Sequence, residues 1–366
     1  MSRALRVAVA SGKGGTGKTT LATALAIALA GGATPARTRP ESHRADVFET
    51  AAWTGTEGEA WTGAWTGPET DEAPPSPIKP RVAGGPQLVT LADCDVEQPN
   101  LKLFFKLSDP VTAPVWVPAP TIDLEACTGC GVCAERCKFG ALAVVNGKPL
   151  WFGGLCHGCG ACWLSCEAGA ISRGRRRIGI TADAATEHGG LQLVWGELKT
   201  GEPLAPPLIH ATKALAATTG NLTILDAPPG TSCPLVETLR GVDYCLLVTE
   251  PTPFGLHDLR LATEVTRIMG VRAAVVLNRA GLGNREPVAE YAAAAGLPLL
   301  LDIPFARRTA AILAQGGTLL DTGAEWRERL LQLWNEVHGL IERTPEDDLV
   351  ARTMISGGPR RSVESP

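Results

Sequence analysis

Near the start of the chain, residues 4–20 read ALRVAVASGKGGTGKTT. The apolar run over residues 4–10 predicts a buried strand, and the helix-forming residues from Lys18 to Ala30 predict a helix. The turn between them fits the pattern G-x-x-x-x-G-K-[ST], whose backbone N–H groups surround phosphate oxygens at a helix N-terminus. The segment therefore predicts a phosphate-binding loop with the residues Gly12, Gly14, Gly15, Thr16, Gly17, Lys18, Thr19 and Thr20.

Two lysines lie in this loop, and we expect both to be catalytic. Lys18 stands where the side chain reaches the β- and γ-phosphates, and Thr19 stands where a hydroxyl ligates Mg²⁺. Lys13 adds a charge that can meet negative charge developing on phosphate, in its own site or across a dimer. A solvated loop lysine is the alternative for Lys13.

Further short apolar runs follow the same pattern along the chain. Four of them end just before polar residues, and several alternate with stretches of helical periodicity; these residues are Asp93, Asp226, Glu250 and Asn278. Such an alternation predicts an α/β fold with a mostly parallel sheet that helices cover on both faces. Ligands of such sheets bind beyond the carboxyl ends of the strands, so we expect these polar side chains near the phosphate loop.

Three segments resemble a known family. KGGTGKTT at 13–20, DCDVEQPN at 93–100 and DAPPG at 226–230 resemble the deviant Walker A, switch I and switch II motifs of the MinD/ParA/nitrogenase-iron-protein/Mrp ATPases, a SIMIBI-type P-loop fold. The resemblance covers residues 1–30 and 87–340, and it is strongest for members with an inserted ferredoxin domain.

The resemblance implies roles for individual residues. Asp95 would orient or activate the attacking water, Asp226 would hold Mg²⁺ through water, and Asn278 would contact the adenine of ATP. Asp93 is either a carboxylate of the nucleotide site or a residue that caps the following turn, and both roles are open. The family also implies a homodimer with ATP at or near its interface.

Eight of the 11 cysteines lie between residues 127 and 166, in two copies of C-x2-C-x2-C-x3-C. This is the two-cluster bacterial ferredoxin pattern, in which the fourth cysteine of each run ligates the other cluster. We therefore expect a small α+β ferredoxin-like domain with two [4Fe–4S] clusters, and zinc is the alternative. The expected ligands are Cys127, Cys130, Cys133 and Cys166 for cluster 1 and Cys137, Cys156, Cys159 and Cys162 for cluster 2.

Three cysteines lie outside the repeats. Cys245 is expected in the core. Cys94 lies inside the segment that resembles switch I, Cys233 follows the segment that resembles switch II, and both are expected to be free thiols. A third metal site that involves Cys233 is the alternative.

The domain organisation follows from composition. We expect a P-loop domain over 1–117 and 179–345, a ferredoxin-like domain over 118–178 and a disordered tail over 346–366. A Pro-rich stretch at 114–120 and a basic stretch at 173–179 are interpreted as the linkers around the insert. Gly and Pro make up 16 of the 56 residues at 31–86, which predicts a disordered insertion or, alternatively, a tryptophan-anchored partner segment.

Composition also excludes some functions. The net charge is −4, so no overall basic field attracts nucleic acid, and no apolar run approaches the roughly 18 residues of a membrane helix. We expect a cytoplasmic protein.

We expect an ATPase that couples switch motion to electron transfer toward an acceptor protein. The alternative is an Mrp-type carrier of Fe–S or other metal cofactors, and a positioning ATPase and an ATP-dependent amidation enzyme are two further candidates.

Overall fold

The computed structural model describes residues 4–31 and 88–343. These residues form two compact units: residues 4–31, 88–117 and 176–343 make up the P-loop unit, and residues 118–175 make up the cysteine unit. The expected insertion at 31–86, except for Gly31, lies outside the described residues. The expected tail at 346–366 also lies outside them.

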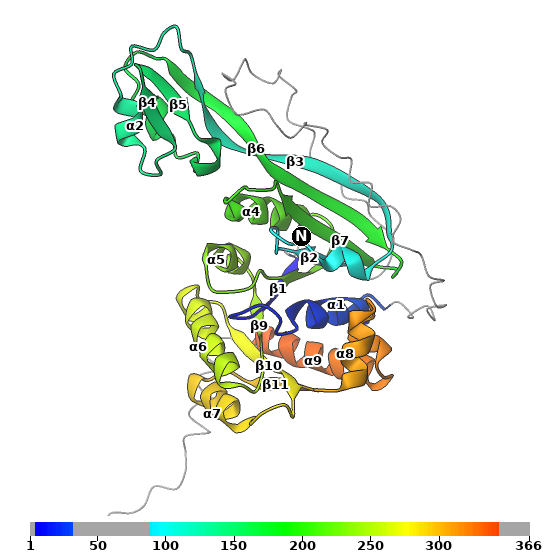
Figure 1. Cartoon of the computed structure of the whole chain (residues 1–366). Helices are drawn as coiled ribbons and strands as arrows, with labels where there is room; N and C mark the ends of the chain where they lie inside the picture. The colour runs from blue at the N-terminus through cyan, green and yellow to red at the C-terminus, as the bar shows by residue number, and fades with distance from the viewer. Residues whose placement is uncertain (1–3, 32–87, 344–366) are drawn as a thin grey trace, which may run out of the picture. The chain divides into compact units, whose positions relative to one another are not determined.

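In the described part of the chain, the P-loop unit is built on a nine-stranded sheet with the order β11-β10-β9-β1-β8-β2-β7-β6-β3 (Figure 1). Every neighbouring pair from β11 to β7 is parallel, and β6 runs antiparallel to β7. The expected α/β class with a mostly parallel sheet is therefore confirmed. The strands are β1 (Leu5–Ala10), β2 (Val89–Asp93), β3 (Leu107–Ile122), β6 (Ile171–Thr186), β7 (Leu191–Leu198), β8 (Leu222–Asp226), β9 (Tyr244–Thr249), β10 (Ala273–Ala280) and β11 (Leu299–Pro304).

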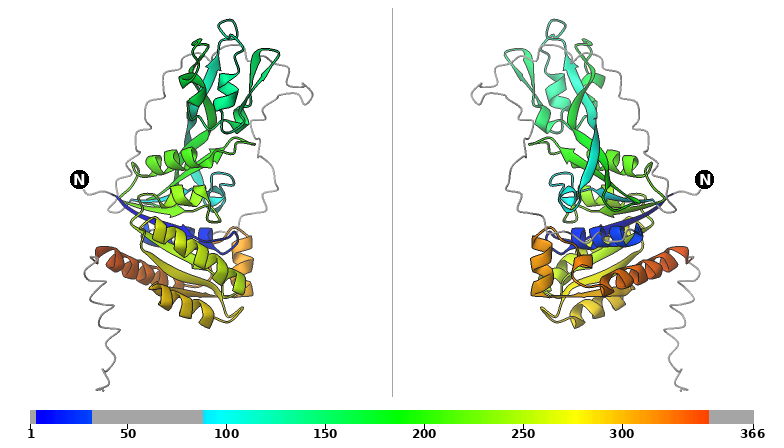
Figure 2. Two further views of the ribbon diagram at one scale, coloured as in Figure 1. Left: turned by 90° about the vertical axis from the view of Figure 1, so that its left-hand side faces the viewer. Right: turned by 90° about the vertical axis from the view of Figure 1, so that its right-hand side faces the viewer.

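Helices cover both faces of the central strands, because alternate residues of each strand point to opposite sides (Figure 2). Val7 and Val9 of β1 pack in one core with α1 (Lys18–Leu29) and α9 (Glu325–Glu342). Ala8 and Ala10 pack in a second core with α4 (Ala205–Ala216), α5 (Cys233–Leu239), α6 (Pro253–Ile268) and α7 (Glu286–Ala295). The remaining short elements are η1 (Leu101–Phe104), α8 (Arg307–Ala314) and η3 (Leu319–Asp321).

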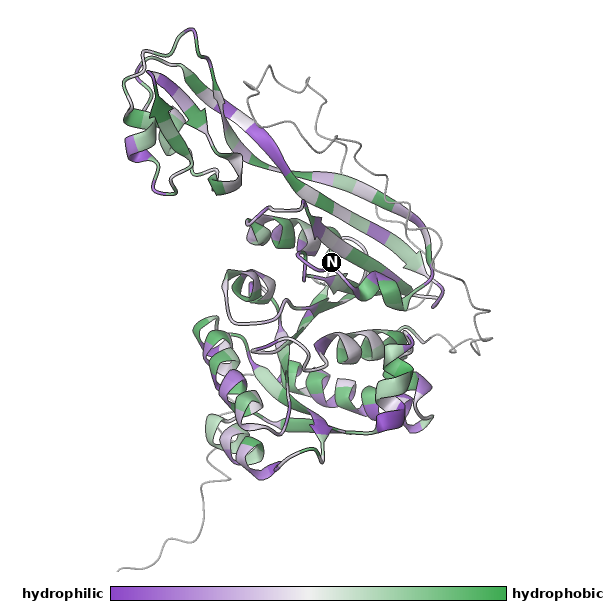
Figure 3. Ribbon diagram, viewed as in Figure 1, coloured by the Kyte–Doolittle hydropathy of each residue, from purple (hydrophilic) through white to green (hydrophobic). Residues whose placement is uncertain are grey.

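The two stretches interpreted as linkers are parts of long strands. Each of β3 and β6 has 16 residues, and the chain passes between the units within each of them. β3 tolerates its four prolines because it is the edge strand of the sheet, where a missing N–H costs no ladder bond. On β6, exposed Arg173, Arg175 and Arg177 alternate with half-buried Gly174 and Arg176, which is the period of a strand. Figure 3 shows a hydrophilic stretch along β6.

The cysteine unit folds its two repeats alike. In each repeat, two glycines with positive φ precede a short helix: Gly129 and Gly131 precede α2 (Val132–Arg136), and Gly158 and Gly160 precede α3 (Ala161–Leu164). An antiparallel hairpin of β4 (Leu142–Val145) and β5 (Lys148–Trp151) joins the repeats, followed by η2 (Gly153–Leu155).

Within residues 4–31 and 88–343, no helix is both long and apolar enough to cross a bilayer.

Candidate functional site

The phosphate loop runs from the carboxyl end of β1 to the first turn of α1, between the strands β8 and β9 that flank β1. Gly17 has φ +94°, and a Cβ there would lie 2.2 Å from the Asn278 side-chain nitrogen. A Cβ on Gly12 would lie 2.3 Å from the backbone oxygen of Asp258. Gly12 is therefore required by close packing against backbone, and Gly17 is required by its left-handed backbone conformation, while a Cβ at Gly17 would also displace the Asn278 side chain.

Thr19 and Asp226 come together at the start of α1. The Thr19 hydroxyl donates a hydrogen bond to Asp226 Oδ2 at 2.6 Å, and Asp226 ends β8 in register with Val9 of β1. The other carboxylate oxygen, Asp226 Oδ1, is buried with no hydrogen-bond partner among the described residues. A hydroxyl beside a carboxylate with an unpaired buried oxygen fits a Mg²⁺ site, because hard cations take oxygen ligands.

Three ionisable side chains, Lys18, Asp95 and Asp226, influence one another around the Thr19–Asp226 pair. Burial lowers the pKa of Lys18, although the negative charges of Asp226 and Asp95 oppose the shift. Burial raises the pKa of Asp226 and of Asp95, and the Lys18 charge partly offsets both shifts. Lys18 and these two carboxyl groups, which come from three separate segments, thus act on one another electrostatically.

Asp93 caps the segment that resembles switch I. Its Oδ2 accepts hydrogen bonds from the N–H groups of Asn100 at 2.9 Å and Leu101 at 3.0 Å, and its Oδ1 accepts one from Asp95 at 3.1 Å. Burial raises the pKa of Asp93, and the nearby Asp226 charge adds to the rise. The geometry gives Asp93 a structural role, because it caps the turn that follows β2.

Asn278 lies against the phosphate loop. Its side-chain nitrogen donates to the Thr16 backbone oxygen at 2.7 Å, so the carboxamide supports the loop from the end of β10. Its expected contact with adenine stays a prediction.

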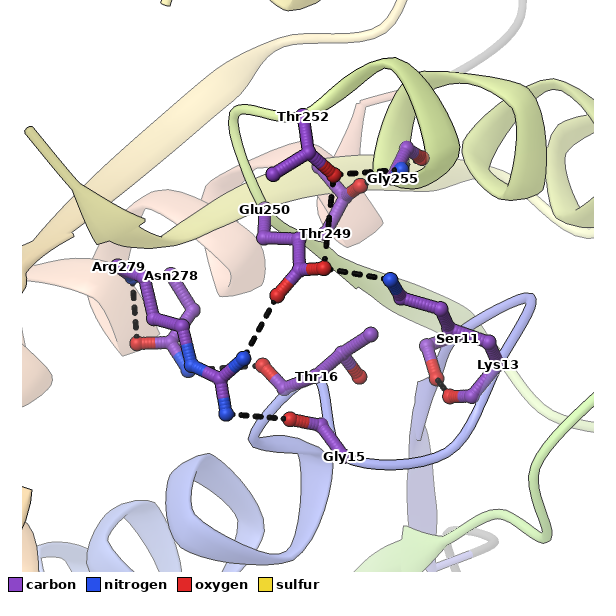
Figure 4. A network of polar contacts seen from close by, with 10 residues as sticks. All are labelled: Ser11, Lys13, Gly15, Thr16, Thr249, Glu250, Thr252, Gly255, Asn278 and Arg279. Carbon is purple, nitrogen blue, oxygen red and sulfur yellow. Dashed lines mark hydrogen bonds and ion pairs between the residues drawn. The ribbon is translucent and has the colours of Figure 1, made fainter. Parts of the chain in front are cut away.

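A network that sequence reasoning did not anticipate surrounds Lys13 (Figure 4). Lys13 Nζ lies 2.5 Å from Glu250 Oε1, and Arg279 donates to Glu250 Oε2 at 2.8 Å and to the Gly15 oxygen at 3.0 Å. The sequence offered only one signal for this network, namely that Glu250 and Asn278 each follow an apolar strand.

The cysteine unit brings the expected cluster 2 ligands to one pocket. Cys137, Cys156, Cys159 and Cys162 all line it, together with aromatic side chains. The rings of Phe139 and His157, which also line the pocket, stack with their centroids 3.9 Å apart.

Three of the expected cluster 1 ligands come from the first repeat, and the fourth, Cys166, comes from the second. Burial raises the pKa of the Cys133 thiol, and the neighbouring thiols of Cys127 and Cys130 contribute to the rise. Cys166 and Cys133 pack against the small core of the unit. No three His, Cys, Asp or Glu side chains in the described part of the chain converge as ligands of a single ion.

The three remaining cysteines differ in exposure. Cys94 and Cys245 are fully buried, and burial raises the pKa of both thiols far above the ordinary value. Cys233 begins α5 and is exposed.

Comparisons with known proteins agree with this geometry. Residues 126–171 match the family model of the 4Fe-4S dicluster domain. The uncharacterized protein MJ0578 of Methanocaldococcus jannaschii is 31% identical over 69% of this chain and 87% of its own length. The uncharacterized protein MJ0579 of the same organism is 29% identical over 53% of this chain and 70% of its own length.

Among solved structures, the septum site-determining protein MinD from Pyrococcus horikoshii OT3, complexed with Mg-ADP, is 17% identical to this chain. The match has a TM-score of 0.49 and covers 93% of this chain and 99% of the MinD chain.

The mostly parallel sheet, the phosphate-binding loop after its first strand and the dicluster match over residues 126–171 together define a protein of the P-loop α/β fold with an inserted iron–sulfur domain. More particularly, the chain belongs to the family of the Methanocaldococcus jannaschii protein MJ0578.

Proposed function

We propose that this protein binds and hydrolyses ATP and uses the resulting switch motion to control electron transfer through two [4Fe–4S] clusters. The observation that carries the proposal is the order of elements after β2. The segment capped by Asp93 leads through η1 directly into β3, and β3 continues into the cysteine unit. The capped segment is thus connected to the cysteines through η1 and β3 alone, and a displacement of this segment can be transmitted along them.

The loop supports the nucleotide part of the proposal. Lys18 would pair with phosphate oxygens, and Thr19 and Asp226 would hold Mg²⁺, which supplies charge neutralisation on the phosphates when bound. Asp95 is half-buried and is electrostatically coupled to Lys18, so its carboxylate is suited to orient a water molecule toward the γ-phosphate. The water attacks phosphorus, the bond to the β-phosphate oxygen breaks, and ADP and phosphate leave.

The cysteine unit supports the redox part. Both repeats carry four cysteines and positive-φ glycines at matching positions, so we propose two [4Fe–4S] clusters, each held by three cysteines of one repeat and the fourth cysteine of the other. Full ligand sets favour clusters that the protein retains over clusters that it passes on. We further propose a homodimer and a separate acceptor protein.

The test uses the full chain, purified without oxygen, together with two variants that separate its functions. Lys18→Ala should abolish ATP binding and leave the iron content unchanged, since the loop and the cysteines lie in different units. Cys137→Ala should lose about half of the iron and bind ATP normally, because it removes one ligand of one cluster. ATP binding is measured by calorimetry, iron is measured by colorimetric assay, and cluster potentials are measured by electron paramagnetic resonance titration.

Coupling predicts that MgATP shifts the cluster potentials, or changes the rate of cluster reoxidation, in the wild type and not in Lys18→Ala. Cluster spectra and reactivity that ignore MgATP in a wild-type chain that binds it would refute the coupling. Transfer of intact clusters to an apo-ferredoxin would instead favour the carrier function.

A further inference from the structure

We propose that Glu250 is a positioning residue that holds Lys13 in the nucleotide-free chain and makes its release depend on the terminal phosphate of ATP. The inference rests on the proposed ATP binding and adds to it a means by which the position of Lys13 depends on which nucleotide is bound. Its basis is the network around Lys13 shown in Figure 4.

The contact that holds Lys13 is short and partly shielded from water. Lys13 Nζ lies 2.5 Å from Glu250 Oε1, and the Glu250 side chain is only 10% exposed against 33% for Lys13. A lysine on a glycine-rich loop would otherwise sample many rotamers. The ion pair therefore fixes the ammonium group on the carboxylate side.

Glu250 is itself held in place by the turn between β9 and α6. The Thr252 N–H donates to the Glu250 backbone oxygen at 2.8 Å, and the Thr252 hydroxyl lies 3.5 Å from Glu250 Oε1. A Cβ on Gly255 would lie 2.3 Å from the Glu250 backbone oxygen, so the turn closes tightly over a glycine. The carboxylate is thus presented to Lys13 by a rigid turn.

Arg279 ties the second oxygen of the carboxylate to the same loop. Its guanidinium donates to Glu250 Oε2 at 2.8 Å and to the Gly15 oxygen at 3.0 Å. Arg279 has φ +56°, an unfavourable conformation for a residue with a side chain, and its two hydrogen bonds help to maintain it. Glu250 thus binds Lys13 directly and is linked to Gly15 through Arg279 at the end of β10.

The charge on Glu250 is compatible with this role. Burial by itself would raise its pKa, but the hydrogen bond and charge of Lys13, together with Arg279, bring the pKa below the ordinary value. The carboxylate is consequently ionised at neutral pH and competes with phosphate for Lys13. ATP presents more phosphate charge than ADP and therefore competes better with Glu250 for the Lys13 ammonium group. Binding of ATP breaks the ion pair and carries its energetic cost. Binding of ADP leaves the ion pair in place, so the pair lowers the ADP affinity less.

The test compares the binding of a non-hydrolysable ATP analogue and of ADP by calorimetry, in the full chain with Mg²⁺. Glu250→Gln keeps the shape and an acceptor for Arg279 but removes the competing charge. We expect the affinity for the analogue to rise by about tenfold, typical of the coupling between contacting groups, and the ADP affinity to change by less than about twofold.

Two further variants show whether the effect acts through Lys13. In a Lys13→Ala background, Glu250→Gln should no longer change the affinity for the ATP analogue or for ADP. Glu250→Asp, which retains the charge, should move the ratio of the two affinities back toward the wild-type value. Glu264→Gln is the matched control, because it removes the same charge from an exposed pair with Arg267 on α6 and should leave both affinities unchanged.

An equal change for ATP analogue and ADP in Glu250→Gln, or an effect that persists in the Lys13→Ala background, would overturn this inference and leave the proposed ATPase intact. A wild-type chain that binds neither nucleotide would overturn both.

Discussion

Gly17 is constrained both by its backbone conformation and by its packing in the phosphate loop. Its φ of +94° disfavours any side chain, and the Asn278 amide occupies the space that a Cβ would need. We predict that Gly17→Ala weakens ATP binding by at least about tenfold, because the added Cβ must displace the Asn278 amide that supports the phosphate loop. The left-handed conformation itself costs about 1–2 kcal/mol in the free energy of unfolding. Calorimetric titration with ATP and Mg²⁺ measures the loss.

Gly31, at the other end of α1, supplies the control. It has φ +71°, but a Cβ there would meet no atom within 4 Å among the residues that the structure describes. Gly31→Ala should therefore lower the free energy of unfolding by the backbone cost alone and leave ATP affinity within about twofold of the wild type. Equal ATP affinities for the two variants would show that contact between Gly17 and Asn278 does not shape the loop.

The segment from Cys94 to Leu101 depends on a single carboxylate at its start. Asp93 accepts three backbone hydrogen bonds that hold this segment at the end of β2. Asp93→Ala leaves these N–H groups without their acceptor, and we predict a loss of about 2–4 kcal/mol in the free energy of unfolding. Asp93→Asn keeps one acceptor oxygen and should lose clearly less. Urea unfolding of both variants tests the order, and equal small losses would show that the segment is held by other contacts.

The sequence predicts the elements whose signal is local. β1, the phosphate loop and α1 follow from residues 4–30, and the fold class follows from repeated apolar strands that end at polar residues. β3 and β6 could not be predicted in this way. Proline at 110, 114, 118 and 120 argues against a strand unless the strand is known to lie at a sheet edge, and this knowledge requires the whole sheet order.

The same limit applies to the site. The roles of Lys18 and Thr19 are suggested by a local pattern, whereas Lys13 and Glu250 are 237 residues apart, and only the neighbouring positions of β1 and β9 bring them together. Arg279 carries no sequence signal at all, since its role depends on a left-handed backbone conformation at the end of β10.

At the scale of the whole molecule, the described residues of the P-loop unit carry their own cores. The buried residues of both large hydrophobic clusters come from residues 7–117 and 178–337, and none comes from residues 118–175. β3 and β6 are neighbours in the sheet, so a short glycine-rich turn can join residue 117 to residue 176. We predict that a chain shortened in this way still unfolds cooperatively and contains no iron–sulfur cluster.

The shortened chain should also bind ATP within about twofold of the wild-type affinity, because distant independent sites contribute additively. Its ATP hydrolysis rate should no longer differ between oxidising and reducing conditions, whereas coupling in the full chain makes the wild-type rate differ. Lys18→Ala in the shortened chain is the control and should bind no ATP. Loss of cooperative unfolding would show that the P-loop unit needs the cysteine unit for its stability. A rate that still responds to the redox state would place the redox sensor outside the cysteine repeats, and Cys233, which is exposed on α5, would be the first residue to replace.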